Sequence, residues 1–465
     1  MDARFALMED DKENLVDEIL SLRHSNKDLA AEIEKLRQEI EVLKKQPTGK
    51  PGDKKLNFLK NADRPGLPPH RWGRKPGHPG VTRLKPTHID REVVQELSAC
   101  PDCRHALGPA VGREEHIQED IVPAKVEAIR FVHCRYWCPG CKTLVTAPPA
   151  PDEIPHSYLG PQTLATMVWL KYHVVVPGNK IVALFKDLMG LTVSEGAVAQ
   201  ALQRLAHHLG VEAGVVLAAL KAAPVKHVDE TGWKINGAKR WLWSVADKAW
   251  AYTRIADSRG SKIPKELLGH PFTGVIVADF FSAYNKMKGV HQKCLVHLHR
   301  EIKKVRGDHP PPDFTVPEKK IKRLLADAHR LAERRGRTPP LLFARKVRRL
   351  KDRLFHFATD VYSHKGWQRL SKRLLKHKDQ IFTFLDVPGV PPDNNRAERA
   401  IRPHVILRNR SFHNRTDAGA HAHSVLTSLV QSLLLQNRPV IPALAASYLA
   451  HKHGVVNPVL FTSAG

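Results

Sequence analysis

Three acidic residues in this sequence stand where a metal-dependent reaction could use them. Asp229 closes one β-type run, and Asp279 closes a second run of apolar residues, Val275–Ala278. The third acid, Glu398, lies in a segment that is typical of a helix start. Because the chain has a formal net charge of +27, these carboxylates predict a site that holds divalent metal against a phosphate backbone.

Metal-assisted phosphoryl transfer is the chemistry that such a site could perform. Mg²⁺ takes oxygen ligands in octahedral geometry and keeps several waters, so a few carboxylates and a substrate phosphate complete its shell. Two ions of Mg²⁺ or Mn²⁺ about 4 Å apart can activate an attacking oxygen and stabilise a leaving oxygen. Singly, each acid is also explained as a turn residue or as a charge at a helix start. Spacing alone therefore does not select three of the 47 acids.

The residue that follows Asp229 is a further candidate. Side chains alternate along a strand, so Asp229 and Glu230 cannot both face one site if the strand continues. We expect the strand to end at this acidic pair and a turn at Thr231-Gly232 to follow. Asp229 is assigned to the site, and Glu230 is kept as an auxiliary candidate.

Cysteines form a second candidate metal site. Two CxxC motifs, each followed by turn residues, are typical of a zinc ribbon, in which four thiolates close one structural Zn²⁺ site. The four cysteines are Cys100, Cys103, Cys138 and Cys141. Cys134 lies outside this scheme and is expected to be a small buried residue rather than a fifth ligand. The residues 129–133 between the motifs are strand-like, and the CxxC spacing indicates a reducing cytoplasm.

The elements that position the acids are expected within residues 223–437, where the periodicity is that of strands. Three antiparallel strands followed by strands with helical crossovers is the order expected of a ribonuclease-H-like fold. The expected strands are Val225–Asp229, Arg240–Ala246, Trp250–Ile255, Val275–Asp279 and Lys293–His297.

A basic helical insertion at about residues 306–390 is expected to interrupt this domain. Residues 318–378 contain twenty Lys and Arg against five Asp and Glu, which favours a DNA-facing surface. A solvated helical block is the alternative. A C-terminal helical segment, 438–465, follows the domain.

Residues 157–222 are predicted to form a separate helical domain. Helices are expected at 164–175, 180–188 and 195–209, with Ser194 as the N-cap of the last. The layout is similar to a helix-turn-helix, which would place the last helix in a DNA major groove. Any helical hairpin gives the same pattern, so both interpretations stay open.

The N-terminal part of the chain predicts self-association. Leucine recurs every seven residues from Leu15 to Leu43, with Ile or Asn26 at the other seam position. This pattern favours a parallel two-stranded coiled coil over residues 1–46, with a helix packed on its own chain as the alternative.

Residues 47–90 form a basic linker rich in Pro and Gly, in which Arg74 and Lys75 are candidates for phosphate contact. Residues 91–150 form the zinc-binding domain.

Composition limits the class of protein. A charge of +27 is typical of proteins that bind nucleic acid or anionic membrane. No apolar run approaches the roughly 20 residues that span a bilayer, and the acidic N-terminus does not indicate a signal peptide. We therefore expect a cytoplasmic nucleic-acid protein of multidomain α+β class, built from a coiled coil, a zinc-ribbon-like domain, a helical domain and a ribonuclease-H-like α/β core with a helical insertion. A basic binder without chemistry is the alternative.

The chain resembles a transposase of the insertion sequence 66 family, in the DDE class of bacterial transposases, over nearly its full length. The Asn394-Asn395-Arg396-Ala397-Glu398-Arg399 block is the most specific match. The other matching segments are the N-terminal heptads, 74–80, the two CxxC motifs, 229–233, 279–284, 294–297 and 400–403.

The resemblance implies that Asp229, Asp279 and Glu398 are the metal-binding triad and that the four cysteines bind zinc in a domain associated with end recognition. It implies cleavage of double-stranded DNA at the element's terminal inverted repeats, followed by attack of the freed 3′-hydroxyl on target DNA. The enzyme would act as a zipper homodimer or a larger synaptic complex. Family elements usually encode two small accessory proteins, which are further candidate partners.

Several residues near the triad are auxiliary candidates. Asn395, Arg399 and Arg402 could orient Glu398 or contact phosphate, and Arg402 could pair with Glu398 one helical turn away. His297 and Arg300 follow a strand near the site and are candidate helpers. Two alternatives share these residues: a non-catalytic dimeric DNA-binding regulator derived from a transposase, and a nuclease that cuts without joining.

Overall fold

The computed structural model describes residues 34, 88–109, 117–118, 126–306 and 314–461. They belong to two compact units, 1–118 and 119–465, which are described separately. Apart from Glu34, the predicted coiled coil lies outside the described residues, as do Arg74 and Lys75. Dimerisation through the heptads and phosphate contact by the linker therefore stay predictions.

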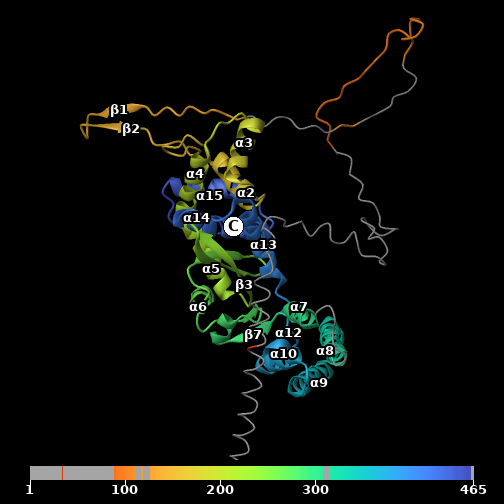
Figure 1. The fold of residues 1–465 in the computed structure, drawn as a ribbon. Coiled ribbons are helices and arrows are strands. Elements are labelled where there is room, and N and C mark those ends of the chain that lie inside the picture. Colours follow the sequence, from red (N-terminus) through yellow and green to blue (C-terminus); the bar gives the residue numbers. More distant parts are fainter. Residues whose placement is uncertain (1–33, 35–87, 110–116, 119–125, 307–313, 462–465) are drawn as a thin grey trace, which may run out of the picture. The chain divides into compact units, whose positions relative to one another are not determined.

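The second unit is built on a five-stranded mixed sheet (Figure 1). Its order is β5-β4-β3-β6-β7, with β3, β4 and β5 antiparallel and with β6 and β7 parallel to β3. The strands are β3 (Val225–Ile235), β4 (Ala238–Ala246), β5 (Ala251–Ala256), β6 (Val275–Ala278) and β7 (Val290–Lys293). The predicted combination of helices with a mixed sheet is confirmed.

Strand β3 does not end where the sequence predicted. It passes through Thr231 and Gly232 without a turn and stays paired with β4 as far as Ile235. The chain reverses instead at Asn236-Gly237, where both residues have positive φ, 47° and 78°. Asn-Gly accepts these angles at little cost and is the stronger hairpin signal. The expected turn at Thr231-Gly232 was wrong, and the two acids lie inside a strand.

The final predicted strand was also misplaced. β7 ends at Lys293, and α7 (Leu295–Arg306) begins directly after it. His297 and Arg300 therefore lie on the first turns of a helix rather than after a strand. Leu295, Leu298 and Ile302 are the buried residues of α7, and their helical spacing sets which face of the helix turns inward.

The two faces of the sheet are covered by different layers. On β6, Ile276 and Ala278 belong to one core cluster, whereas Val275 and Val277 belong to another, as the alternation of side chains along a strand requires. The first cluster joins the sheet to helices from distant parts of the sequence. They are α2 (Pro161–Tyr172), α3 (Gly178–Met189), α4 (Glu195–His208), α5 (Gly210–Ala222), α6 (Lys262–Leu268), α14 (Asp417–Leu435) and α15 (Val440–Lys452).

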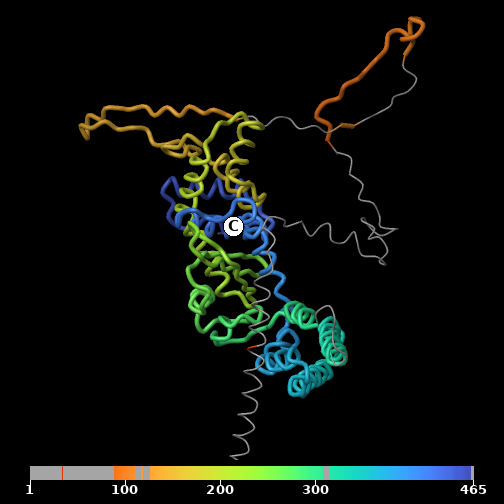
Figure 2. Tube along the Cα trace, viewed as in Figure 1, coloured from red at the N-terminus to blue at the C-terminus, as the bar shows by residue number. Residues whose placement is uncertain are grey.

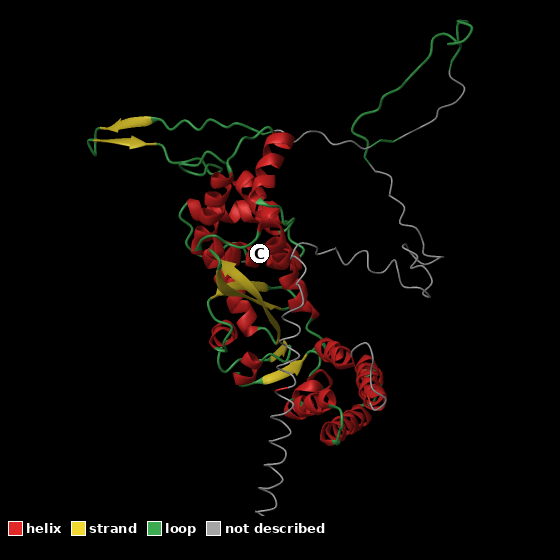
Figure 3. Cartoon of the chain, viewed as in Figure 1, coloured by secondary structure: helices red, strands yellow, loops and turns green. Residues whose placement is uncertain are grey.

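The helices of residues 157–222 thus share one core with the C-terminal helices. In Figure 2 the yellow helices α2–α4 lie beside the blue C-terminal helices, and Figure 3 shows this helical layer next to the strands. Ser194 caps α4 as predicted, because its side chain accepts a hydrogen bond from the Ala197 N–H at 3.1 Å. Val198, Leu202 and Leu205 of α4 are buried in the shared core, so only the opposite side of this helix is open to a partner.

The edge strand β5 is protected by serines of α14. Three serine hydroxyls, spaced four residues apart, accept hydrogen bonds from alternate backbone N–H groups of the strand. The pairs are Ala251 with Ser432, Thr253 with Ser428 and Ile255 with Ser424, at 3.1, 2.9 and 3.2 Å. An unpaired edge would offer these groups to another strand, so α14 closes this side of the sheet.

The basic insertion is helical, as predicted, and lies between β7 and α13 (Asn395–Ser411). Its helices after α7 are α8 (Thr315–Glu333), α9 (Pro340–Thr359), α10 (Lys365–Lys376), α11 (Lys378–Ile381) and α12 (Thr383–Asp386), with a 3-10 turn at Arg335–Arg337. The apolar residues at helical spacing on α8 and α9, such as Leu324 and Leu350, are buried together. They pack with Val275 and Val277, so the insertion covers one face of β6.

The cysteine-rich part of the second unit is a short hairpin of β1 (Arg135–Cys138) and β2 (Thr143–Thr146). Residues 129–133 lie outside any strand, contrary to expectation. Cys134, expected to be buried, is exposed, because no core cluster includes this hairpin among the described residues.

Within the described ranges, no single helix is both long and apolar enough to cross a membrane. The consecutive helices α4 and α5 reach the required length and apolar composition only when they are taken together, and the angle between them is 56°. Both contribute residues to the shared core, among them Leu205 and Val216.

Candidate active site

Asp229 of β3 and Asp279, the residue that follows β6, lie level with each other at the same end of two parallel strands. β3 pairs with β6 in a register that runs from Val225↔Val275 to His227↔Val277, and two further residues along each chain are Asp229 and Asp279. Neighbouring strands are about 4.8 Å apart, so the register brings the two acids to the same end of the sheet. Each Oδ1 accepts a local backbone hydrogen bond, from Glu230 N–H at 2.9 Å and Phe281 N–H at 2.8 Å.

The third acid is positioned by Asn394, the residue before α13. Asn394 is fully buried. Its Nδ2 donates to the Val228 carbonyl at 2.9 Å, and its Oδ1 lies 3.2 Å from Nδ1 of His227. Its backbone N–H also reaches Sγ of Cys294 at 3.2 Å. The start of α13 is thereby joined to β3 next to Asp229, and Glu398 follows in the first turn of the helix.

Glu398 is paired with a basic residue of α7. Nη2 of Arg300 donates to both carboxylate oxygens of Glu398, each at 3.0 Å. His297 lies beside them, with Nδ1 3.8 Å from Oε1 of Glu398. The Glu398 side chain, in the first turn of α13, is partly buried, with 28% of its surface exposed. Both helper candidates of α7 therefore contact the third acid.

Glu230 faces away from Asp229 and has partners of its own. Oε2 accepts a hydrogen bond from the Tyr284 hydroxyl at 2.6 Å, and Oε1 accepts from Arg259 at 2.7 Å. The Arg259 guanidinium lies over the rings of Trp241 and Phe281, 4.6 and 4.0 Å from their centroids. The alternation argument was correct for a continuing strand, so Glu230 supports the site from the opposite face of β3.

A buried lysine lies beneath Asp279. Nζ of Lys293, the last residue of β7, donates to the Asp279 carbonyl at 3.0 Å. Burial lowers the pKa of Lys293 to about 8. This bond joins the chain after β6 to the neighbouring strand β7 and so holds Asp279 at the end of the sheet.

The electrostatics of the site favour cation binding. Burial, and then the negative charges of Glu230 and Asp279, raise the pKa of Asp229 to about 7, with a smaller contribution from Glu398. Burial also raises the pKa of Glu230. A buried carboxylate surrounded by like charges is unfavourable when ionised, and a divalent cation would relieve that repulsion. Carboxylate oxygens are also the donors that Mg²⁺ and Mn²⁺ prefer.

The three carboxylates do not converge on one metal-binding position in this structure. In the part of the chain that the structure describes, no three His, Cys, Asp or Glu side chains converge closely enough to hold a metal ion. At Glu398 both carboxylate oxygens accept hydrogen bonds from the Arg300 guanidinium. The residues fit a divalent metal by type, because carboxylate oxygens are the donors that such ions prefer, and the three acids would have to draw together to share one.

The two CxxC motifs have the local geometry of metal-binding turns. The Cys141 N–H lies 3.5 Å from Sγ of Cys138, and the N–H groups of Cys141 and Gly140 lower the pKa of the Cys138 thiol. In the first unit, the N–H groups of Cys103 and Asp102 lower the pKa of Cys100 in the same way. Thiols that ionise readily are the better metal ligands. Cys100 and Cys103 lie in the first unit, and Cys138 and Cys141 lie in the second.

The remaining candidates on α13 are at its surface. Arg399 and Arg402 are exposed, and Asn395 is partly exposed, with its N–H bonded to Asp393. The expected pairing of Arg402 with Glu398 was wrong, because Glu398 is paired with Arg300 across the site.

Sequence reasoning missed the residues that hold the acids in place. Asn394, His227 and Lys293 are buried polar residues, and Arg259 and Tyr284 hold Glu230. A signal existed for Asn394, since it stands in the Asn-Asn pair of the most specific motif. Arg259 had none, because its contact with Glu230 joins positions 29 residues apart.

The fold and the site define a mixed α/β protein with an acidic site at the carboxyl end of its sheet, in a strongly basic chain. The profile described as "Transposase IS66 family" matches residues 156–422, more than half of the chain, and includes all three acids. A second profile, "zinc-finger binding domain of transposase IS66", matches residues 98–142. The chain belongs to the IS66 family of transposases.

Chains similar to this one occur in Sinorhizobium fredii (strain NBRC 101917 / NGR234). "Uncharacterized protein y4jD" is 26% identical over 387 residues, which cover 75% of this chain and 74% of the relative. "Uncharacterized protein y4qI" is 24% identical over 383 residues, which cover 74% of this chain and 69% of the relative. The similarity extends over most of each chain, and the names of these relatives assign no activity.

Proposed function

We propose that this protein is a DDE-type DNA transposase that cuts at the terminal inverted repeats of its insertion sequence and joins the 3′-hydroxyl ends to target DNA. The register of β3 and β6 carries the proposal, because it places Asp229 and Asp279 level at one sheet edge. Asn394 adds Glu398 to the same edge. The strand order β5-β4-β3-β6-β7 supports a ribonuclease-H-like core.

The roles of the residues follow from their contacts. Asp229, Asp279 and Glu398 would hold two Mg²⁺ or Mn²⁺ ions, which when bound supply the charge that activates an attacking oxygen and stabilises a leaving oxygen. Glu230 orients the β3 side of the site through Tyr284 and Arg259. Arg300, released from Glu398, would remain near the site as a partner for substrate phosphate.

Residues outside the core would bring DNA to the site. One Zn²⁺ held by the two CxxC motifs would stabilise the zinc-finger domain, which the family associates with element ends. The heptads of residues 1–46 would pair two copies, and Arg74 and Lys75 would contact phosphate along the linker. The exposed side of α4 and the accessory proteins of the element are further candidate contacts, and the protein would act in the bacterial cytoplasm.

The same residues would serve a second candidate function, that of a non-catalytic dimeric DNA-binding regulator derived from a transposase. The two candidates differ in product, because only the transposase joins DNA strands.

A strand-transfer assay separates them. Purified protein is incubated with a labelled duplex carrying the element end, a supercoiled target, and Mg²⁺ or Mn²⁺, with and without the accessory proteins. We expect joined products from the wild type and from Asp187→Ala, which removes an exposed acid of α3, but none from Asp279→Ala. Joining by Asp279→Ala would refute the assigned triad. Cleavage without joining would support a nuclease, and binding without either product would support the regulator.

A further inference from the structure

A basic furrow lies between α8 and α9 of the insertion, away from the three acids. It consists of two adjoining hollows of about 250 and about 740 Å³, which share Asp327 and Arg353 in their walls. Lining residues recur at helical spacing from 320 to 334, along α8 to its C-cap Arg334, and from 346 to 360, along α9 to its C-cap Asp360. At 1.5 Å per residue, each helix gives the furrow a length of about 21 Å.

The walls of the furrow are strongly cationic. The smaller hollow has five basic side chains and one carboxylate, and the larger one adds Lys320, Arg323 and a second carboxylate, Asp360. The five are Arg330, Arg334, Lys346, Arg349 and Arg353, all of them exposed. A narrow cleft lined by one sign of charge concentrates its field and attracts polyanions.

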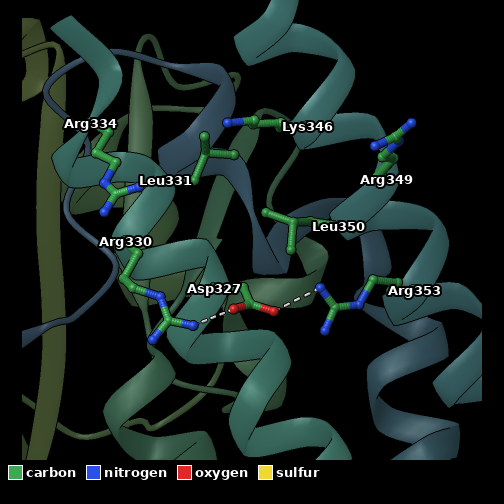
Figure 4. Close-up of a pocket in the computed structure, with 8 residues that line it drawn as sticks. All are labelled: Asp327, Arg330, Leu331, Arg334, Lys346, Arg349, Leu350 and Arg353. Carbon is green, nitrogen blue, oxygen red and sulfur yellow. Dashed lines mark hydrogen bonds and ion pairs between the residues drawn. The ribbon is translucent and has the colours of Figure 1, made fainter. Parts of the chain in front are cut away.

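Asp327 organises the arginines around it. Figure 4 shows Arg330 of α8 and Arg353 of α9 reaching its carboxylate from the two helices, while Lys346 extends across toward Leu331. Arg353 donates at 2.8 Å, and Arg330 bonds the other oxygen. The carboxylate thereby pairs with one guanidinium group from each helix, and this bridge joins the two walls of the furrow.

The floor of the furrow belongs to the core of the insertion. Leu324, Leu331, Leu350 and Phe357 line it and are buried in one cluster. Packing of these residues sets the spacing of the two helices. The basic side chains are therefore carried by a rigid frame rather than by a mobile loop.

We propose that this furrow binds the phosphodiester backbone of duplex DNA, as a site separate from the acidic one. A furrow of about 21 Å matches the axial length of about six base pairs, at about 3.4 Å each, and the winding of the strand would bring some of its phosphates against the furrow. The contacts would be independent of sequence, because the lining offers charge rather than groups placed against base edges. The proposal rests on the proposed function only in taking DNA as the substrate.

Salt-dependent binding tests the furrow without any catalytic step. Binding of the full chain to a labelled duplex of arbitrary sequence is measured by fluorescence anisotropy in EDTA, over roughly 50–200 mM salt. The variant Lys346→Gln/Arg349→Gln removes two charges from the furrow wall. Arg345→Gln/Arg348→Gln is the matched control, because it removes the same charge from exposed positions of α9 that line neither hollow.

The furrow variant should bind more weakly by a factor on the order of 10–100 at 0.1 M salt, with a slope of log K against log salt smaller by about 2. The control should bind within about threefold of the wild type, since its charges would stay hydrated. Equal losses in the two variants would overturn the proposal in favour of a general charge effect, as would no loss in either. Strand transfer retained by a furrow variant that binds normally would leave the proposed function intact.

Discussion

Asn394 should matter far more than Asn395, although the two are adjacent and chemically identical. Asn394 is fully buried and holds the Val228 carbonyl and His227 through its side chain. Burial lowers the pKa of His227 to about 4, so at neutral pH this ring is uncharged and forms a neutral hydrogen bond with the amide. Asn394→Ala removes both side-chain bonds, whereas Asn395→Ala changes a partly exposed side chain.

The magnitude follows from the hydrogen bonds. A buried group that loses its partner costs about 1–3 kcal/mol, so two such losses destabilise the domain by on the order of 3 kcal/mol. With an m-value of roughly 3 kcal/mol/M, the midpoint of urea unfolding should fall by about 1 M. Substitutions at exposed positions usually stay within about 0.5 kcal/mol, which sets the expectation for Asn395→Ala.

Urea unfolding followed by tryptophan fluorescence provides the assay, since Trp233 and Trp243 are buried in the sheet. Hydrogen exchange at residues 395–400 should also accelerate in Asn394→Ala, because the start of α13 loses its attachment to β3. Equal midpoints for the two alanine variants would refute the assignment of Asn394 as the anchor. So would a stability loss in Asn394→Ala without faster exchange in α13.

Two further predictions concern the buried histidines and the cysteines. Burial lowers the pKa of His404 to about 3, and that of His423 also lies below its ordinary value of 6.5. The unfolded chain therefore binds protons that the folded chain does not. The stability that the neutral rings contribute is complete above about pH 6.5 and is lost as the pH falls, by about 2 kcal/mol at pH 5 for His404. Urea midpoints at pH 7.5 and 5 should show this loss, smaller in His404→Gln and unchanged in exposed His421→Gln; a midpoint independent of pH would contradict it. For the cysteines, Cys138→Ser should lower bound zinc, measured by atomic absorption, from about one ion per chain to none, whereas Cys134→Ser should retain it. Equal zinc content in the two variants would contradict the assigned ligand set.

Local sequence patterns predicted what depends on near neighbours. The apolar spacing of α8 and α9 gave their buried faces, and Ser194 was recognised as an N-cap from its place before a helix. Asp229 and Asp279 were candidates because each closes a run that is typical of a strand, and the family resemblance implied their place in the triad. In each case the residues that decide the structure lie within a few positions of one another.

Long-range pairing decided the parts that sequence reasoning misjudged. β3 extends past Gly232 because β4 pairs with it as far as the Asn236-Gly237 turn. This pairing keeps Thr231 and Gly232 in the strand, although the sequence predicted a turn there. Glu398 pairs with Arg300, which is 98 residues away, rather than with Arg402 on its own helix. The core shared by α2–α5 with α14 and α15 likewise joins segments that no periodicity connects.

The central claim, that Asp229, Asp279 and Glu398 act as one metal site, is tested most directly by counting bound Mn²⁺. Electron paramagnetic resonance would follow Mn²⁺ titrated into the full chain with duplex DNA, for the wild type, Asp279→Asn, Glu398→Gln and the exposed control Asp187→Asn. We predict that the wild type and the control bind two ions at the site and that each triad variant loses at least one of them. Unchanged Mn²⁺ binding in both triad variants would contradict the account.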